Sequence, residues 1–315
     1  MKDTFGRTVD YLRISVTELC NYRCVYCMPP EGVEKRTHGE MLSFEEIEEI
    51  ARAAADCGIR KLRLTGGEPL VRRGIVSLCQ SLRRIEGIEE LALTTNGSLL
   101  LRCAAALKEA GVDRLNISLD TLSPERFSEI TRGGRLQDVL SGLAAAQNAG
   151  FTNTKLDAVL LGGVNTDEIA ALAALTRDRP LCVRFIELMP LGVCAALPPE
   201  RFVSAELVLR TLPELIRVGT DGTAELYRLP DAQGTVGLIR AMSRAFCSRC
   251  SRLRLTADGK LKPCLHSAQE ISVRGLHGQA LRDAIIQAAE AKPSGHRLNE
   301  QGFSNTDRAM HRIGG

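Results

Sequence analysis

The sequence predicts an α/β protein built on an incomplete parallel (βα)6 barrel, and three observations carry this prediction. From about residue 10 to 188, short apolar segments of strand character alternate with segments of helical periodicity. The alternation gives about six strand–helix units, whereas a closed eight-fold barrel needs two more. The periodicity stops near residue 190, where Pro190 and further prolines interrupt the chain. A doubly wound open sheet fits the same alternation, so the strand pattern alone leaves these two architectures open.

The expected elements follow one another in a regular order. The segments of strand character are residues 11–16, 61–65, 91–94, 114–119, 155–161 and 182–186. The first helix is expected to start at Ser43, because Ser43 and Glu46 have the spacing of a capping box and apolar residues follow at helical spacing. Further helices are expected over 74–85, over 99–110 and up to a stop near Gly150. Such alternation places helices outside a parallel sheet.

The segment after residue 190 changes character. A short β-rich stretch around 225–240 and a helix near 279–291 are expected there, without further strand–helix alternation. We therefore expect two domains, a barrel over 1–190 and a C-terminal domain over 191–315.

Composition and charge exclude several classes of function. With 315 residues, 44% of them hydrophobic, the chain can form a sizeable core. The net charge of +3 and the 4% of aromatic residues argue against simple nucleic-acid binding. No apolar run approaches the length of a membrane span. The first residues, 1–5, lack an apolar signal region, so a cytoplasmic location is expected.

Cysteine usage is the strongest chemical signal. The chain has 11 cysteines, an odd number, and in a reducing compartment clustered cysteines indicate metal binding or catalysis rather than disulfides. Six of them form two groups: Cys20, Cys24 and Cys27, and Cys247, Cys250 and Cys264. Four scattered cysteines lie in apolar segments and are expected to be small buried hydrophobic residues. These four are Cys57, Cys79, Cys103 and Cys182.

The first group follows the first strand directly. Three thiolates on one compact loop can hold three irons of a cubane iron–sulfur cluster, which leaves the fourth iron free to bind a small molecule. Structural zinc usually takes four protein ligands, so zinc is the weaker reading. The second group again supplies three thiolates, but His266 could complete a Cys3His zinc site. Spacing alone therefore leaves zinc and iron–sulfur open for the second group.

The first group resembles the cysteine motif of the radical S-adenosylmethionine (SAM) superfamily. Tyr26 occupies the usual aromatic position, and residues 65–69, Thr-Gly-Gly-Glu-Pro, resemble the superfamily's glycine-rich motif. The resemblance implies a partial parallel barrel, a [4Fe-4S] cluster and SAM, which is cleaved to a 5′-deoxyadenosyl radical that takes a hydrogen atom from the substrate. It implies SAM contacts at Tyr26, Gly67, Ser118 and Met189.

The second group, with its neighbours, resembles the GTP 3′,8-cyclase branch of that superfamily. Residues 246–265 match closely, as do 234–240, 292–296 and 313–315, and the match is weakest over 191–220. The branch implies a second [4Fe-4S] cluster that binds guanine. It also implies a lyase that converts GTP to (8S)-3′,8-cyclo-7,8-dihydro-GTP, the first step of molybdenum cofactor biosynthesis. The sequence after Met189 departs from the commoner pattern of the branch, so the resemblance does not predict the conformation of the 191–204 loop.

The same resemblance assigns the substrate contacts. GTP-binding positions are implied at Arg13, Arg63, Thr94, Lys155, Arg252, Leu253 and Arg254. Arginine suits a triphosphate because its planar fork pairs with phosphate oxygens. Lys61 and Arg184 are further triphosphate candidates. The terminal Gly314 and Gly315 are implied to enter the cavity as a catalytic tail.

The resemblance also implies partners. These are a flavodoxin-like one-electron donor and the downstream cyclic pyranopterin monophosphate synthase, with the chain acting as a monomer or a homodimer. Two alternatives remain open at this point: a peptide-modifying radical SAM maturase with auxiliary clusters, and a zinc-stabilised binding protein without catalysis.

Overall fold

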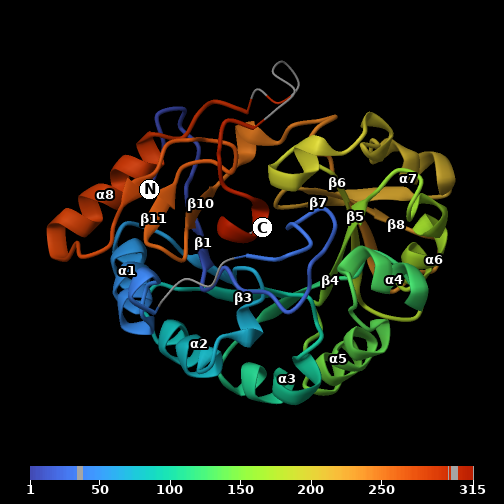
Figure 1. Cartoon of the computed structure of the whole chain (residues 1–315), viewed down its shortest axis with the longest axis horizontal. Helices are drawn as coiled ribbons and strands as arrows, with labels where there is room; N and C mark the ends of the chain where they lie inside the picture. The colour runs from blue at the N-terminus through green and yellow to red at the C-terminus, as the bar shows by residue number, and fades with distance from the viewer. Residues whose placement is uncertain (34–37, 297, 299–303, 315) are drawn as a thin grey trace.

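The computed structural model describes residues 1–33, 38–296, 298 and 304–314. Within these residues twelve strands form one sheet in the order β12-β11-β10-β1-β2-β3-β4-β5-β6-β9-β8-β7. Strands β1 to β6 run parallel to one another and curve into an incomplete barrel with helices around the outside (Figure 1). The predicted (βα)6 barrel is confirmed. Its strands are β1 (Tyr11–Ser15), β2 (Lys61–Thr65), β3 (Glu90–Thr95), β4 (Arg114–Ser118), β5 (Lys155–Leu160) and β6 (Cys182–Glu187).

The helices of this half cover the convex face of the sheet. They are α1 (Phe44–Asp56), α2 (Ile75–Arg83), α3 (Leu100–Glu109), α4 (Pro124–Thr131), α5 (Leu136–Asn148) and α6 (Ile169–Ala174). The predicted capping box is present, because Glu46 N–H donates to Ser43 Oγ over 3.1 Å and Ser43 N–H donates to the Glu46 carboxylate over 2.6 Å. The helix expected to stop near Gly150 is present as α5, which ends at Asn148, but the separate helix α4 before it was not anticipated. Arg132 adopts a left-handed conformation with φ of 54° and ends α4, so α5 starts anew after two glycines.

The C-terminal part extends both edges of the barrel sheet. Its elements are α7 (Glu206–Thr211), β7 (Ile216–Asp221), β8 (Ala224–Arg228), β9 (Thr235–Ile239), β10 (Arg252–Leu255), β11 (Lys260–Lys262), β12 (Ile271–Ser272) and α8 (Gly278–Glu290). Short 3-10 turns lie at His38–Glu40, Pro69–Val71, Thr166–Glu168, Gly192–Ala196, Pro199–Arg201, Cys247–Arg249 and Met310–Arg312. Strand β9 pairs in parallel with β6, and β10 pairs in parallel with β1. The expected β-rich stretch and last helix are present as β8, β9 and α8.

The pairing of β1 with β10 fixes where the two cysteine groups lie. Tyr11 is opposite Arg252 and Ile14 is opposite Leu255. The first cysteine group follows the carboxyl end of β1, whereas Cys250 lies two residues before Arg252, which begins β10. The two groups therefore lie toward opposite ends of the same pair of strands.

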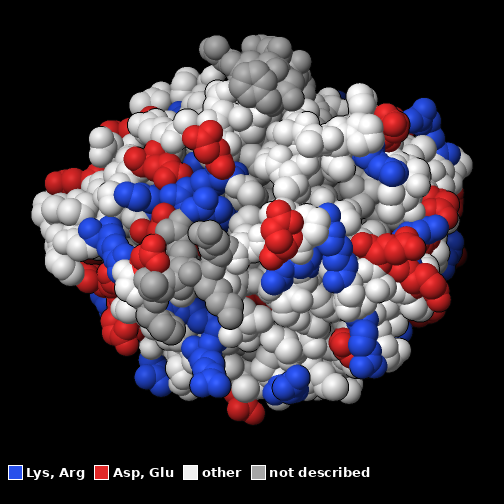
Figure 2. All heavy atoms as spheres, viewed as in Figure 1, with Lys and Arg blue, Asp and Glu red and all other residues white. Residues whose placement is uncertain are grey.

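Apolar side chains between sheet and helices form one large core, which includes the fully buried Leu12, Ile14, Leu62 and Leu64. Of the four cysteines expected to be buried, only Cys79 is. Cys57, Cys103 and Cys182 are half-buried because they lie at a helix end, on an outer helix and at the start of β6. None of the described helices combines the length and apolar character needed to cross a bilayer. On the face shown in Figure 2, basic and acidic side chains are interspersed, as the small net charge suggests.

Candidate active site

The loop after β1 holds three free thiols close to one another. The loop turns tightly, since Cys27 N–H donates to Cys24 O over 2.9 Å and Tyr22 N–H donates to Cys20 Sγ over 3.3 Å. Burial, followed by the charges of Cys20 and Cys194, raises the pKa of Cys27 to about 12. Burial likewise raises the pKa of Cys24, with Cys27 adding to the effect. These thiols would lose their protons on binding a metal centre, which then compensates the buried charge.

Two buried carboxylates, Glu68 and Asp120, form hydrogen bonds that hold the segments around this loop. Glu68 accepts hydrogen bonds from Thr95 Oγ1 (2.7 Å), Asn96 N–H (2.6 Å) and Leu70 N–H (3.0 Å), which ties the glycine-rich turn to the end of β3. Burial outweighs these donors and raises the pKa of Glu68 to about 7. Asp120 accepts from Tyr26 Oη over 2.6 Å and from a backbone N–H over 2.8 Å. Tyr26 is thus oriented through its hydroxyl.

The glycine-rich turn packs directly against the chain that enters the first cysteine loop. A Cβ on Gly66 would lie 2.4 Å from Thr17 O, and one on Gly67 would lie 2.4 Å from Leu19 O. The N–H of Gly67 donates to Thr17 O over 2.7 Å. The close backbone approach explains both glycines, and the expected SAM contact of Gly67 stays a prediction.

The second cysteine group lies among cations. Lys292 is 3% exposed, and its ammonium donates to Arg252 O over 2.7 Å and to Pro263 O over 3.0 Å, with Cys250 Sγ 3.8 Å away. Arg7 donates to Cys247 O over 2.7 Å. Although burial opposes ionisation, the charges of Arg252 and Lys292 lower the pKa of Cys250 to about 6. The surroundings therefore favour an anionic centre at this group.

The geometry bears on the zinc alternative. Within the described residues no three His, Cys, Asp or Glu side chains converge on one metal-ion position, which a single zinc ion requires. His266 packs edge-on against His296 with ring centroids 5.2 Å apart, and its Nδ1 lies 3.1 Å from Ser304 Oγ. His266 is thus engaged elsewhere, and three free thiols in each group remain as a donor set suited to a larger iron–sulfur cluster.

Basic side chains lie between the two cysteine groups. The register places Arg13 opposite Arg63 on one side and opposite Arg254 on the other. Arg63 and Arg254 are buried and Arg13 is half-buried. Desolvation, followed by the charges of Arg254 and Arg63, lowers the pKa of Arg13. Arg63 lies over the Tyr11 ring at 5.5 Å, and its Nη1 is 3.5 Å from Thr94 Oγ1. Such a concentration of desolvated positive charge suits a polyanion.

Leu253 differs from its neighbours on β10. It is fully buried in the apolar core, while Arg252 and Arg254 alternate with it at period two. Any contact of Leu253 with a ligand must come from its backbone.

The end of the chain enters the same region, and Figure 1 shows it curling into the centre of the barrel. Arg254 Nη1 donates to Gly314 O over 2.7 Å, and His311 Nδ1 lies 3.3 Å from Cys27 O. A Cβ on Gly314 would lie 2.6 Å from Thr65 Cγ2. Gly314 therefore sits by the carboxyl ends of β1 and β2, whereas the predicted Gly315 lies outside the described residues.

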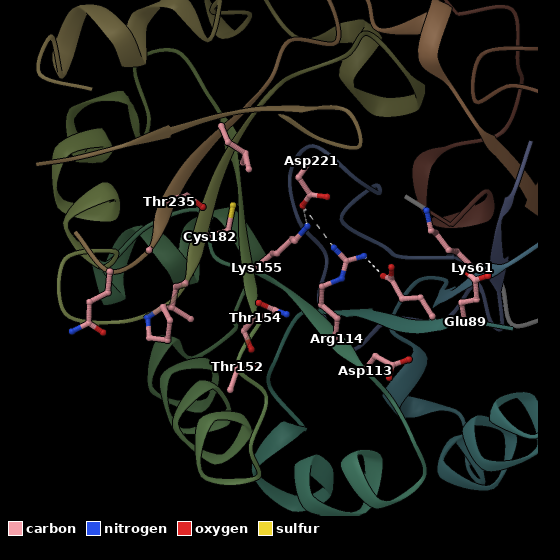
Figure 3. Close-up of a pocket in the computed structure, with 17 residues that line it drawn as sticks. Lys61, Glu89, Asp113, Arg114, Thr152, Thr154, Lys155, Cys182, Asp221 and Thr235 are labelled. Atoms are coloured by element: carbon pink, nitrogen blue, oxygen red, sulfur yellow. Dashed lines mark hydrogen bonds and ion pairs between the residues drawn. The ribbon is translucent and has the colours of Figure 1, made fainter. Parts of the chain in front are cut away.

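A cavity of about 740 Å³ opens at the amino ends of β2 to β6 (Figure 3). Lys61, Arg114 and Lys155 are among its lining residues, each at or near a strand start. Arg184, on β6, is paired with Asp157 through two bonds of 2.6 and 2.7 Å. The triphosphate candidates Lys61 and Lys155 thus share one cavity, close to the arginines on the neighbouring strands.

The remaining predicted SAM contacts lie at the other end of the strands. Ser118 is the last residue of β4, and Met189 follows β6 and is half-buried. Both are at the carboxyl end, as is the first cysteine group, which is the functional edge of parallel barrels.

The sequence reasoning did not identify several residues that the structure brings to the site. Buried Lys292, Glu68 and Asp120 belong here, as do Arg114 and Asp221 in the cavity. Only Lys292 and Glu68 had a local signal, because each lies inside a matched motif. The others reach the site through contacts between segments far apart in the sequence, which periodicity does not reveal.

Two family profiles match the chain. One, described as the Radical SAM superfamily, matches residues 14–176, and the other, described as Molybdenum Cofactor Synthesis C, matches residues 181–298. A protein of Alkaliphilus metalliredigens (strain QYMF) named GTP 3′,8-cyclase is 48% identical over 320 residues, covering 100% of both chains. A protein of the same name from Peptoclostridium acidaminophilum is 49% identical over 319 residues, covering 99% of this chain and 98% of the other. The chain belongs to the radical SAM GTP 3′,8-cyclase family. Membership implies a [4Fe-4S] cluster and SAM, for which Cys20, Cys24 and Cys27 form a fitting donor set.

Solved structures of other proteins share the fold. Streptococcus suis SuiB has a TM-score of 0.64 at 14% identity, over 91% of this chain and 66% of that one. The tagged protein anSMEcpe with bound AdoMet has a TM-score of 0.56 at 13% identity, over 93% and 79%. At these identities the likeness concerns the fold alone.

Proposed function

We propose that the chain is a GTP 3′,8-cyclase, which converts GTP to (8S)-3′,8-cyclo-7,8-dihydro-GTP in the first step of molybdenum cofactor biosynthesis. Its full-length similarity to proteins of that name supports the activity. The structural observation that carries the proposal is the pair of cysteine groups at opposite ends of β1 and β10 with desolvated arginines between them.

In this proposal Cys20, Cys24 and Cys27 hold the cluster that binds SAM, while Cys247, Cys250 and Cys264 hold a second [4Fe-4S] cluster that binds guanine. When bound, the first cluster and SAM supply the hydrogen-atom abstraction that begins the reaction. Tyr26, Gly67, Ser118 and Met189 hold SAM, at the end of the strands where the first cysteine group lies. The chain's own contribution is to bind both ligands and to fix their separation.

The basic residues bind the substrate. Arg13, Arg63, Arg252, Arg254 and Lys155 hold the triphosphate, supported by Thr94 and the Leu253 backbone. Their rigid placement on neighbouring strands fixes the ribose relative to SAM, which raises the effective concentration of the reacting groups. Ile313 and Gly314 close the space beside Arg254 and limit the access of water to it.

Partners follow from the chemistry. A one-electron donor of the flavodoxin type supplies the reducing electrons, and cyclic pyranopterin monophosphate synthase consumes the product. The rival function is that of a peptide-modifying maturase, and the fold is shared with SuiB, which has been solved bound to a precursor peptide. That function leaves the arginine set between the cysteine groups without a use.

The test is anaerobic incubation of the iron-reconstituted protein with GTP, SAM and dithionite. We expect 5′-deoxyadenosine formation that requires GTP, and about eight irons per chain. Formation of 5′-deoxyadenosine that GTP does not stimulate would reject the proposed substrate. Zinc without acid-labile sulfide would favour a binding protein instead.

A further inference from the structure

Lys155 is an almost enclosed cation at the amino end of β5. Only 8% of its side chain is exposed. Burial, followed by the charges of Arg114 and Arg184, lowers its pKa. A cation in such surroundings needs an anionic partner, because desolvation and neighbouring positive charges both oppose its charged form.

Asp221 supplies that anion from outside the barrel. Its carboxylate forms an ion pair with Lys155 Nζ and lies 3.9 Å from Arg114 Nη1, and Figure 3 shows it bridging the two cations at the cavity. Asp221 ends β7, one of the two edge strands of the sheet, and is followed by Gly222 in a left-handed turn with φ of 59°. Its side chain is 42% exposed.

The neighbouring cations are paired differently. Arg184 is held by Asp157, which lies opposite it on the adjacent barrel strand and is half-buried. Arg114 forms its closer ion pair with Glu90, at the start of the adjacent β3. Both of these pairs join adjacent strands of the barrel sheet. Asp221, in contrast, reaches Lys155 from the tip of the β7–β8 hairpin, in which β7 is an exposed edge strand and β8 is mostly buried and paired with β9.

We propose that Asp221 is an internal substitute for phosphate: its carboxylate occupies the anion position on Lys155 and Arg114, and the β7–β8 hairpin tip withdraws when a phosphate chain binds there. The inference rests on the proposed function, which assigns the triphosphate to Lys155. A polyphosphate carries several charges and many acceptor oxygens, so it can displace one carboxylate. An anion that makes only one weak contact cannot displace the Asp221 carboxylate. Asp221 thereby keeps the cationic cavity selective for polyphosphates.

The test is calorimetric titration of the full chain with inorganic tripolyphosphate in the absence of divalent cations. We expect Asp221→Asn to bind tripolyphosphate about five- to tenfold more tightly than the wild type, since the competing charge is gone. The matched control is Glu89→Gln, which removes one negative charge from an exposed position lining the same cavity. It should change the affinity less than about twofold.

A second measurement needs no variant. Hydrogen exchange of the wild-type backbone over residues 216–224 should become faster when tripolyphosphate is added, because the tip loses its ion pair. Slower exchange there, or an Asp221→Asn affinity equal to or weaker than that of Glu89→Gln, would overturn the inference.

The outcomes separate the inference from the proposed function. GTP-dependent 5′-deoxyadenosine formation without any tightening in Asp221→Asn would reject the role of Asp221 and leave the cyclase standing. Tighter tripolyphosphate binding in Asp221→Asn, with no turnover of GTP, would support an anion site guarded by Asp221 and reject the cyclase.

Discussion

The two cysteine groups each offer three thiols, but in opposite electrostatic surroundings. The first lies beside buried carboxylates, Glu68 and Asp120, which hold its loop through hydrogen bonds. The second lies beside cations, and Lys292 and Arg7 donate to the backbone around it. The difference teaches that identical donor sets can be tuned independently, because each loop inherits its charge environment from the strand end where it sits.

The thiol pKa values express this contrast. Burial, with the charges of nearby thiols, raises that of Cys27 to about 12, whereas Arg252 and Lys292, despite burial, lower that of Cys250 to about 6. The first site disfavours extra negative charge and the second favours it. The two groups should therefore respond differently to the same kind of change.

The largest effect should come from removing each set of thiols. Replacing Cys20, Cys24 and Cys27 by Ala should abolish SAM cleavage, because this set holds the SAM-binding cluster in our proposal. Replacing Cys247, Cys250 and Cys264 by Ala should abolish the GTP-derived product and leave the first cluster in place. Iron analysis should give about four irons per chain in each variant. Equal loss of all iron in both would contradict two independent centres.

Removing the cation at the second group should be the next largest effect. Lys292→Met leaves Arg252 O and Pro263 O without their buried donor. We expect a loss of about 3 kcal/mol in the free energy of unfolding, measured in urea. In the same variant, the iron bound by the second cysteine group should be lost before the iron bound by the first. The exposed Lys2→Met is the control and should cost less than about 0.5 kcal/mol. If Lys292→Met were as stable as Lys2→Met, the Lys292 ammonium would not stabilise the second cysteine group.

The tail that contacts both regions offers a smaller perturbation. Gly314→Ala places a methyl group 2.6 Å from Thr65 Cγ2, at a left-handed φ of 67°. We expect this strain to weaken the docking of the tail on the barrel by about 1–2 kcal/mol. The tail should then detach while the barrel stays folded. Limited proteolysis should then cut the tail faster at an unchanged unfolding midpoint. Gly275→Ala, also at positive φ but with open space around it, controls for backbone strain alone.

The smallest expected effect is a pH dependence of the free energy of unfolding that comes from the ion pairs of Arg308. Arg308 joins the Glu270 and Asp258 carboxylates at 2.6 and 2.9 Å. Although burial opposes ionisation, Arg308 keeps the pKa of Glu270 below its usual value of 4.5. This contribution to stability is present above pH 4.5 and is lost as the pH falls further. In cluster-free protein, Arg308→Met should reduce the loss of stability between about pH 5 and pH 3 by about 1 kcal/mol or less. If the free energy of unfolding depended on pH equally in the variant and the wild type, the ion pairs of Arg308 would not contribute to that dependence.

Local signals predicted most of the barrel. The six strands and the Ser43 capping box depend on neighbours in sequence, and the structure has them where they were expected. The two cysteine motifs are equally local signals, and their role as cluster ligands stays a prediction. The split between α4 and α5 was missed because Arg132 adopts a conformation that the residue type does not announce. The β1–β10 pairing and the reach of Asp221 were missed because they join distant segments, for which one sequence offers no periodic signal.

The adjacency of β1 and β10 also constrains how the molecule is made. Tyr11 cannot meet Arg252 until nearly the whole nascent chain has left the ribosome. During that interval β1 presents an open edge that strands of other molecules can join. We expect residues 1–190, expressed alone, to require chaperones and to aggregate, because they lack β10, the strand that shields their first edge.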